Sequence, residues 1–187
     1  SSAASDVYKR QQVQERKGID DFVKMAQANP DIQFIWAGGF SFGKITDGYD
    51  HYKEMVDNPP KNMTFAGIVE REKLVKYLNI ADLFVLPSYD ELFPMSVLEA
   101  FSCGTPVLLR DLDLYKAIID GYYLSGKDFG EMNQVLQKVV ANPQTLQKYS
   151  ELSRKASQQY SEDHLAKIWD EFYHEQYELG KELGQIH

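Results

Sequence analysis

The chain has 187 residues, of which 43% are hydrophobic and 13% aromatic, so it can bury one substantial core but is too short for two full α/β domains. Its excess of 28 acidic over 20 basic residues argues against nucleic-acid binding as the main task. A single cysteine precludes an internal disulfide framework and is consistent with a reducing cytoplasm. The sequence has no run of roughly 18 apolar residues that would predict a membrane-spanning helix.

Residues 1–11 stand apart from the rest of the chain. The segment 6–11 (DVYKRQ) resembles the translation of a transposon sequencing adaptor, and the alternative is a natural disordered leader. We therefore expect 1–11 to be a non-native or disordered leader outside the fold, and 12–187 to form the domain. Because a parallel α/β domain should open with a strand, we also expect the natural protein to continue upstream.

Strand and helix patterns then alternate along the chain. Ile19, Phe22, Val23 and Ala26 have helical spacing and predict an amphipathic helix that ends at Asn29. Further patterns predict a strand over 32–37, a glycine-rich turn, a polar segment over 47–56, strands over 63–68, 82–86, 106–109 and 122–124, and helices over 70–79, 94–103 and 111–119. This alternation predicts an α/β fold, a Rossmann-like doubly wound parallel sheet with right-handed crossovers.

The C-terminal third reads as consecutive helices over 129–141, 143–159 and 161–183, which cover the sheet rather than extend it. The last of these helices carries a wide apolar stripe at helical spacing, formed by Leu165, Ile168, Trp169, Phe172 and Tyr173. Packing of this stripe on the same domain is one interpretation.

The segment 88–106 is the most informative part of the sequence, because it places one carboxylate before a helix and a second inside it. Pro94 suits the first helical position and Gly104 suits the stop. Glu91 then lies in the loop at the positive end of the helix, and Glu99 projects from its second turn. Such a site can hold an anion and the hydroxyl groups next to it.

The spacing of these two glutamates and the residues around them closely resemble the donor-site motif of family-4 retaining glycosyltransferases. The segments 16–19 (RKGI), 37–39 (AGG) and 65–69 (FAGIV) occur in the family's order. The family has the GT-B architecture of two Rossmann-like domains, so the resemblance implies that this chain is the C-terminal donor-binding domain. It also implies that the helix over 161–183 crosses toward a missing N-terminal domain. The segment 109–115 (LRDLDLY) looks most like bacterial transferases that glucosylate or galactosylate diacylglycerol glycolipids.

The resemblance implies a role for each part of the site. Glu91 is the catalytic residue that contacts the hexose and stabilises positive charge at the anomeric carbon. Glu99 binds the ribose, since a carboxylate can accept two hydrogen bonds from a cis-diol; the alternative is a solvated helix glutamate. The expected nucleoside contacts also include Gly67, Ile68 and Val69. The expected contacts to the donor sugar and diphosphate are Arg16, Lys17, Phe93, Met95, Ser96 and Val97.

Two positions depart from the family's pattern. Relatives usually have an arginine where this chain has Gln12. Three alternatives follow: Arg16 compensates, Gln12 is normal in this branch of the family, or the stabilisation of the leaving group is weaker. Pro94 occupies a position where relatives have glycine, which removes one backbone donor. Arg16 and Lys17 also have an alternative interpretation as solvated surface cations.

Other site classes are weakly indicated. Asp111 and Asp113 look like an acid-x-acid metal motif, but they lie at a helix start without neighbouring ligands. The histidines show no paired spacing for zinc, and Gly38, Gly39 and Gly43 do not fit the dinucleotide-binding pattern. We therefore expect no metal and no cofactor.

The resulting hypothesis is a metal-independent transfer of a hexose from UDP-glucose or UDP-galactose to a diacylglycerol-based glycolipid. We expect a cytoplasmic protein whose full-length form is peripheral on the inner face of the membrane, with no nucleic-acid partner. This fragment alone should be inactive without the N-terminal acceptor domain. The alternatives are a GT-B transferase for an exopolysaccharide or wall glycan, and a noncatalytic nucleotide-sugar-binding module.

Overall fold

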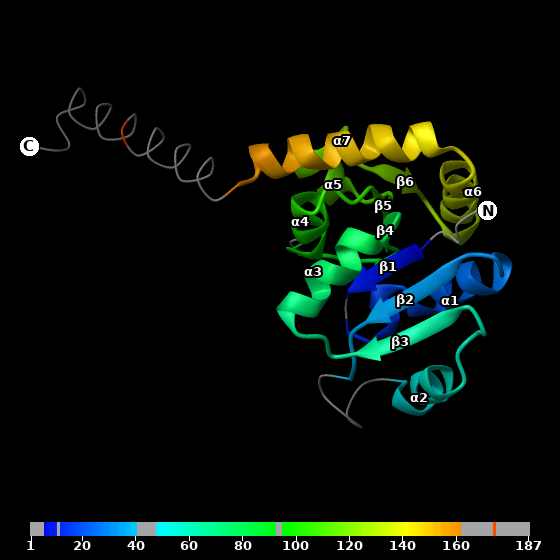
Figure 1. Cartoon of the computed structure of the whole chain (residues 1–187). Coiled ribbons are helices and arrows are strands. Elements are labelled where there is room, and N and C mark those ends of the chain that lie inside the picture. Colours follow the sequence, from blue (N-terminus) through cyan, green and yellow to red (C-terminus); the bar gives the residue numbers. More distant parts are fainter. Residues whose placement is uncertain (1–5, 11, 41–47, 93–94, 162–173, 175–187) are drawn as a thin grey trace, which may run out of the picture.

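A parallel sheet forms the centre of the computed structural model, which describes residues 6–10, 12–40, 48–92, 95–161 and 174. Its 6 strands have the order β3-β2-β1-β4-β5-β6 (Figure 1). The strands are β1 (Asp6–Arg10), β2 (Gln33–Ala37), β3 (Met63–Gly67), β4 (Leu83–Leu86), β5 (Val107–Arg110) and β6 (Leu124–Gly126). This is the order of a Rossmann-like doubly wound sheet, so the predicted fold class is confirmed.

Strand β1 corrects our expectation for the start of the chain. We placed residues 1–11 outside the fold, but Asp6–Arg10 pairs with β2 on one side and with β4 on the other. Val7 and Tyr8 are 0% and 1% exposed and belong to different core clusters, because successive side chains of a strand point to opposite faces. This pair of buried side chains is what a central strand requires. The foreign origin of the segment stays a prediction.

Apart from α2, the described helices agree with the predicted ranges to within two residues at each described end. They are α1 (Ile19–Ala28), α2 (Tyr49–Asp57), α3 (Arg71–Ile80), α4 (Met95–Ser102), α5 (Asp113–Ile119), α6 (Phe129–Val140) and α7 (Pro143–Gln159). A 3-10 helix over Glu15–Lys17 precedes α1. Helix α2 was expected only as a polar segment, because its apolar face is narrow: Tyr52 is its buried residue, with Met55 and Val56 partly buried against the core.

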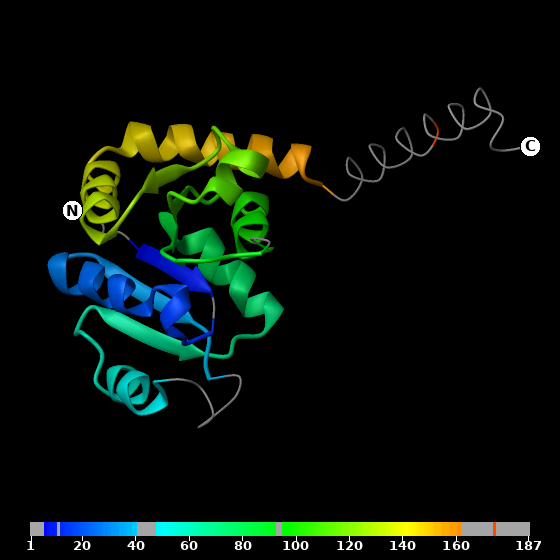
Figure 2. The same cartoon turned by 180° about the vertical axis from the view of Figure 1, so that it is seen from behind.

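The helices bury the two faces of the sheet separately. One face, seen from the front in Figure 2, packs on α1 and α6 through residues such as Phe22 and Leu136. The other face, seen in Figure 1, packs on α3, α4 and α5 through residues such as Leu74, Phe101 and Tyr115. Both faces of the central strands are therefore covered, as parallel sheets require, and ligands must reach the sheet at an edge.

Helix α7 closes the described part of the chain and lies across the top of the molecule in Figure 1. The last predicted helix, 161–183, lies almost wholly outside the described residues, together with its apolar stripe, so the domain contact proposed for it stays a prediction. Among the described helices none is both long and apolar enough to cross a membrane.

Candidate functional site

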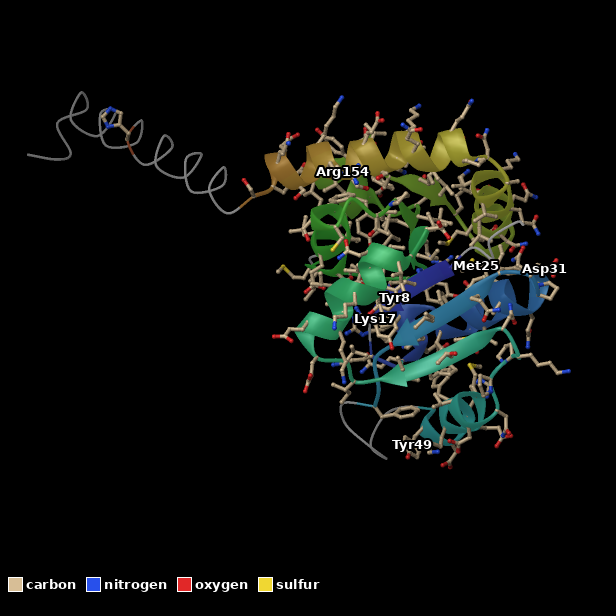
Figure 3. The ribbon with its side chains drawn as sticks, in the orientation of Figure 1. Tyr8, Lys17, Met25, Asp31, Tyr49 and Arg154 are labelled. Atoms are coloured by element: carbon tan, nitrogen blue, oxygen red, sulfur yellow. The ribbon has the colours of Figure 1, made fainter. Side chains whose placement is uncertain are left out.

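Two loops lie next to each other where the strand order reverses, between β1 and β4. Residues 12–18 follow β1 and residues 87–92 follow β4, so both loops leave the carboxyl edge of neighbouring parallel strands. Figure 3 shows Lys17 at this edge, beyond the end of β1, whereas Asp31 lies at the opposite edge, just before β2. Open α/β sheets bind ligands at this reversal point, outside the carboxyl ends of their strands.

The backbones of the two loops approach each other closely. The Tyr89 amide donates to the Arg16 carbonyl at 2.9 Å. Gly18 has a φ of 71°, and a Cβ added there would lie 2.2 Å from the Pro87 carbonyl oxygen. Any side chain at this position would therefore push the loops apart, which explains the glycine after Lys17.

Lys17 and Glu91 make the central contact between these loops. The Lys17 Nζ lies 2.9 Å from both Glu91 Oε1 and Oε2, so the ammonium group donates to both oxygens. The two side chains are only 10% and 6% exposed. Hydrogen bonds between charged groups are stronger than neutral ones, and burial limits screening by salt. The structure thus brings together the residues that the family resemblance links to the diphosphate and to the hexose.

The Arg16 side chain lies in a different environment. Arg16 is exposed, and its Nε donates to the Gln14 side chain at 3.2 Å. Gln12, which replaces the family's usual arginine, is half-buried. This geometry fits the surface-cation alternative for Arg16, and its contact with a diphosphate stays a prediction.

Helix α4 follows the Glu91 loop and presents its first turn to the same edge. Met95 is 61% exposed, whereas Ser96 and Val97 are buried, so Val97 can offer a ligand only its backbone. Glu99 is half-buried one turn further along α4. The first backbone N–H groups of a helix have no partner within the helix and suit an anion. Phe93 lies outside the described residues.

The predicted base-binding segment lies further along the same edge. Gly67 ends β3 with a φ of 66°, and its carbonyl accepts from the Gly38 amide at 2.7 Å. Ile68 is 83% exposed beside Gly39, and Val69 is half-buried. Because β3 lies three positions from β4 in the sheet, a spacing of about 4.8 Å per strand separates this segment from Glu91 by roughly 14 Å.

Two buried hydroxyl groups near the Glu91 loop lack a hydrogen-bond partner within the described part of the chain. They belong to Ser96 at the start of α4 and to Tyr115 on α5, which is 0% exposed. Burial raises the pKa of Tyr115 above its usual value, and the negative charges of Glu91 and Asp90 raise it further. Tyr115 is therefore a neutral hydroxyl close to the catalytic candidate.

A buried charged cluster lies beneath these loops and was not among the sequence predictions. Asp21 on α1 is 4% exposed and Arg110 at the end of β5 is 5% exposed, and they form an ion pair. Tyr89 packs on the guanidinium of Arg110. An arginine that ends an apolar strand is the only sequence signal, because Asp21 lies off the apolar stripe of α1.

The rejected metal motif has a different partner in the structure. Lys116 Nζ lies 2.9 Å from Asp111 and 3.6 Å from Asp113, so both carboxylates face an ammonium group. The described residues include no cluster of three or more side chains suited to hold a metal ion. Whether the reaction is metal-free stays a prediction.

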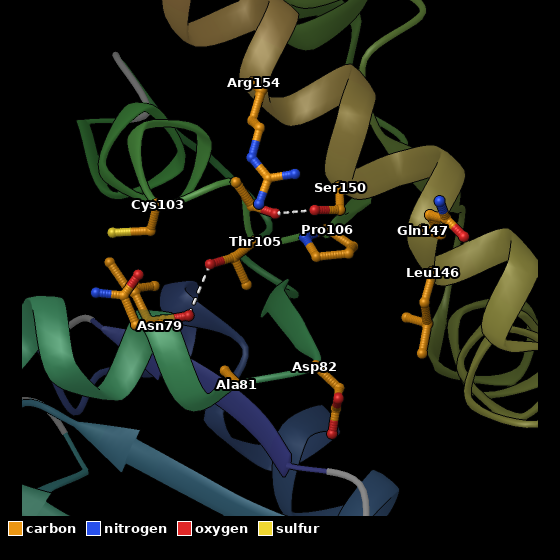
Figure 4. Close-up of a pocket in the computed structure, with 12 residues that line it drawn as sticks. Asn79, Ala81, Asp82, Cys103, Thr105, Pro106, Leu146, Gln147, Ser150 and Arg154 are labelled. Carbon is orange, nitrogen blue, oxygen red and sulfur yellow. Dashed lines mark hydrogen bonds between the residues drawn. The ribbon is translucent and has the colours of Figure 1, made fainter.

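A cavity of about 250 Å³ lies at the opposite edge of the sheet (Figure 4). It is lined by the residues that precede β4 and β5 and by one side of α7, and it contains none of the predicted site residues. Thr105 Oγ1 donates to the Leu78 carbonyl and Ser150 Oγ to the Gly104 carbonyl, at 2.8 and 2.7 Å. These bonds attach helices to the sheet, and we assign the cavity no ligand.

Comparison with known proteins gives a consistent result. The family described as "Glycosyl transferases group 1" matches residues 7–158. The chain is 53% identical to the alpha-galactosylglucosyldiacylglycerol synthase of Streptococcus pneumoniae over 170 residues, which are 91% of this chain and 46% of that protein. The chain thus spans about half the length of this relative.

Solved structures share the fold. The sucrose-phosphate synthase of Thermosynechococcus elongatus is similar with a TM-score of 0.79 at 22% identity, over 96% of this chain and 47% of that one. Anabaena HepE, solved in complex with UDP and glucose, is similar with a TM-score of 0.71 at 17% identity, over 83% of this chain and 44% of that one.

Proposed function

Because the chain belongs to the glycosyl transferases group 1 family, we propose that it supplies the donor-binding domain of a retaining family-4 hexosyltransferase. The direct contact between Lys17 and Glu91 is the observation that carries this proposal. In a sugar nucleotide the terminal phosphate is bonded to the anomeric carbon. A residue for the diphosphate and a residue for the hexose must therefore be neighbours, and these two side chains meet from loops that are 74 residues apart in sequence.

Lys17 acts on the leaving group in this proposal. Its ammonium group neutralises the negative charge that develops on the departing nucleoside diphosphate, a task that other enzymes give to a metal ion. The backbone N–H groups of Met95, Ser96 and Val97 at the start of α4 add further donors. The proposed reaction therefore needs no metal and no cofactor.

Glu91 acts on the hexose. Its carboxylate binds hydroxyl groups of the sugar and stabilises the positive charge that develops at the anomeric carbon. In a retaining reaction the acceptor attacks from the face that the leaving group departs. An oxygen of the diphosphate can then take the proton of the acceptor hydroxyl, so Glu91 needs no proton-transfer role.

The nucleoside lies along the remaining part of the edge. Glu99 accepts hydrogen bonds from the ribose hydroxyls, and the backbone of Gly67, Ile68 and Val69 contacts the base. UDP is the proposed nucleotide, with glucose or galactose as the sugar. The Anabaena structure with UDP and glucose has the same fold and supports this choice of donor.

A diacylglycerol-based glycolipid is the proposed acceptor. The name of the Streptococcus pneumoniae relative, together with 53% identity, supports it. The acceptor site would lie in the part of the protein that this chain does not contain, at the inner face of the membrane. We therefore expect the isolated chain to bind UDP but to transfer no sugar.

Two substitutions in the longer protein test the assigned roles. Glu91→Gln should lower kcat far more than UDP affinity, because its contacts strengthen only in the transition state. Glu99→Ala should weaken UDP binding by about 1–3 kcal/mol, the cost of losing hydrogen bonds to a charged group. Equal losses of kcat and UDP affinity in Glu91→Gln would move Glu91 to the nucleotide site.

The product identifies the reaction class. Labelled UDP-glucose and UDP-galactose are supplied separately with monoglucosyl-diacylglycerol, and the lipid and polymer fractions are counted. Label in the lipid is the expected result. Label in an exopolysaccharide or wall glycan would show that the acceptor is that polymer and not a glycolipid. UDP binding without any labelled product would favour a noncatalytic binding module.

A further inference from the structure

The guanidinium group of Arg110 joins three segments beneath the Glu91 loop. Its Nη2 donates to Asp21 Oδ2 on α1 at 2.5 Å, and its Nε donates to the Pro87 carbonyl at 3.0 Å. Its Nη1 donates to the Lys127 carbonyl, also at 3.0 Å. One side chain thus ties the start of the Glu91 loop to α1 and to the turn after β6.

Tyr89 completes this cluster from the loop itself. Its ring lies over the Arg110 guanidinium, with 4.1 Å from Cζ to the ring centre, and its hydroxyl donates to Asp21 Oδ2 at 2.9 Å. Its amide donates to the Arg16 carbonyl, next to Lys17. Burial and the hydrogen bond to Asp21 raise the pKa of Tyr89, which keeps the hydroxyl as a donor.

Stability alone does not account for such a cluster. Burying a charged pair costs desolvation free energy, and apolar residues of similar volume often give equal or greater stability. Directional bonds, in contrast, fix a position. Residues 87–92 form no helix or strand, so these bonds hold the loop that carries Glu91.

We propose that Arg110, Asp21 and Tyr89 are positioning residues that hold the Glu91 carboxylate in its contact with Lys17. Tyr89 is two residues before Glu91, and the Arg16 carbonyl that it binds belongs to the neighbour of Lys17, so the cluster fixes both sides of the contact. The consequence for sugar transfer rests on the proposed function. The effect on the Lys17–Glu91 contact does not.

The first experiment measures that contact directly in this chain. The ¹⁵N signal of the Lys17 ammonium, identified as the lysine signal that Lys17→Met removes, should show slowly exchanging protons because the group is buried and bonded to a carboxylate. Tyr89→Phe and Arg110→Lys are the test variants. Tyr160→Phe is the matched control, because it also removes one tyrosine hydroxyl bond, to the Ile118 carbonyl.

Tyr89→Phe should speed exchange of the Lys17 protons several-fold, and Arg110→Lys should speed it more, while Tyr160→Phe leaves it unchanged. Tyr89 is 49% exposed and loses only its hydroxyl, so this variant tests the proposal even if Arg110→Lys fails to fold. An unchanged Lys17 signal in folded Tyr89→Phe would overturn the proposal.

The second experiment separates positioning from nucleotide binding. In the longer protein Tyr89→Phe should lower kcat roughly tenfold, since a misplacement of about 1 Å can cost up to about a hundredfold in rate. The affinity for UDP should change less than about twofold, because this variant keeps the backbone bond from the Tyr89 amide to the Arg16 carbonyl on the Lys17 side of the site. Equal losses in kcat and UDP affinity would contradict the positioning role. If the wild-type chain binds no UDP but the Lys17 signal responds to the substitutions as expected, the proposed function is wrong and the positioning role of the cluster still holds.

Discussion

The two edges of the sheet are held together by different chemistry. At the carboxyl edge, ionised side chains join the loops: Lys17 binds Glu91, and Arg110 binds Asp21. At the amino edge, neutral side chains donate to backbone carbonyls. These donors are Asn62 to Ala26, Asn29 and Ile32, Thr105 to Leu78, Ser150 to Gly104, and Ser153 to Thr105.

The difference separates a structural edge from an edge that can accept a ligand. A hydroxyl or amide bonded to a carbonyl satisfies buried backbone groups and has no reason to exchange its partner. An ammonium group bonded to a carboxylate can also attract a second anion, such as a diphosphate, through charge-assisted hydrogen bonds. The cavity at the amino edge therefore needs no ligand.

The largest expected effect is a loss of stability when one buried charge at the carboxyl edge is removed. Arg110→Met should lower the free energy of unfolding by about 3–5 kcal/mol, because Asp21 stays buried without its arginine partner. Urea denaturation measures the loss. The double variant Asp21→Leu/Arg110→Met should recover much of it, and no recovery would mean that the pair stabilises the fold in itself.

Lys17 tests the same edge through its ligand. Lys17→Met should weaken UDP binding by about 1.5–3 kcal/mol, or roughly ten- to 150-fold, since it removes a charged hydrogen-bond donor. Isothermal titration of the folded variant gives this number. Lys24→Met, an exposed lysine on α1, is the control and should leave the affinity unchanged. Equal UDP affinities in the wild type and Lys17→Met would favour the alternative that Lys17 is only a surface cation.

The amino edge should respond in stability only. Ser153→Ala removes the bond to the Thr105 carbonyl and should cost about 1 kcal/mol of unfolding free energy. Its affinity for UDP should equal that of the wild type. A loss of UDP affinity in this variant would contradict the proposal that the amino edge contributes to stability and not to ligand binding.

The smallest expected effect concerns Tyr115 and alkaline pH. Its pKa is raised in the folded state, so the unfolded chain releases the proton first, near pH 10, and stability falls as the pH rises above that value. The contribution lost at pH 10.5 should be less than about 1 kcal/mol. Tyr115→Phe should make stability less dependent on pH in this range, because it removes the titrating hydroxyl. At pH 7 the substitution should be neutral or slightly stabilising, because the hydroxyl has no partner among the described residues. Marked destabilisation at pH 7 would show that the hydroxyl is bonded.

Much of the fold follows from the sequence, because apolar runs and helical spacing report burial locally. The prediction missed β1, because residues 6–11 resemble an adaptor and were excluded from the fold, although Val7 and Tyr8 are buried side chains that point to opposite faces. It also placed β6 two residues too early. Helix α2 was missed because one buried tyrosine gives little periodicity. The two missed elements, β1 and α2, are short segments whose burial depends on contacts with residues far away in the sequence.

The site shows the same limit. Glu91 and Lys17 could be named from motifs, and the structure joins them, but the distance between them depends on the order β1-β4 in the sheet. The Asp21, Tyr89 and Arg110 cluster could not be predicted, because its members are polar residues far apart in sequence. Periodicity gives no information on which buried charges pair.

A titration of the wild-type chain with UDP in the presence of EDTA tests the account most directly. We predict that the chain binds UDP without a divalent metal, because Lys17 and the first turn of α4 supply the positive charge, and that Glu99→Ala weakens this binding. Failure to bind UDP, or binding that returns only with Mg²⁺, would contradict the account and make Asp111 and Asp113 candidates for metal ligands again.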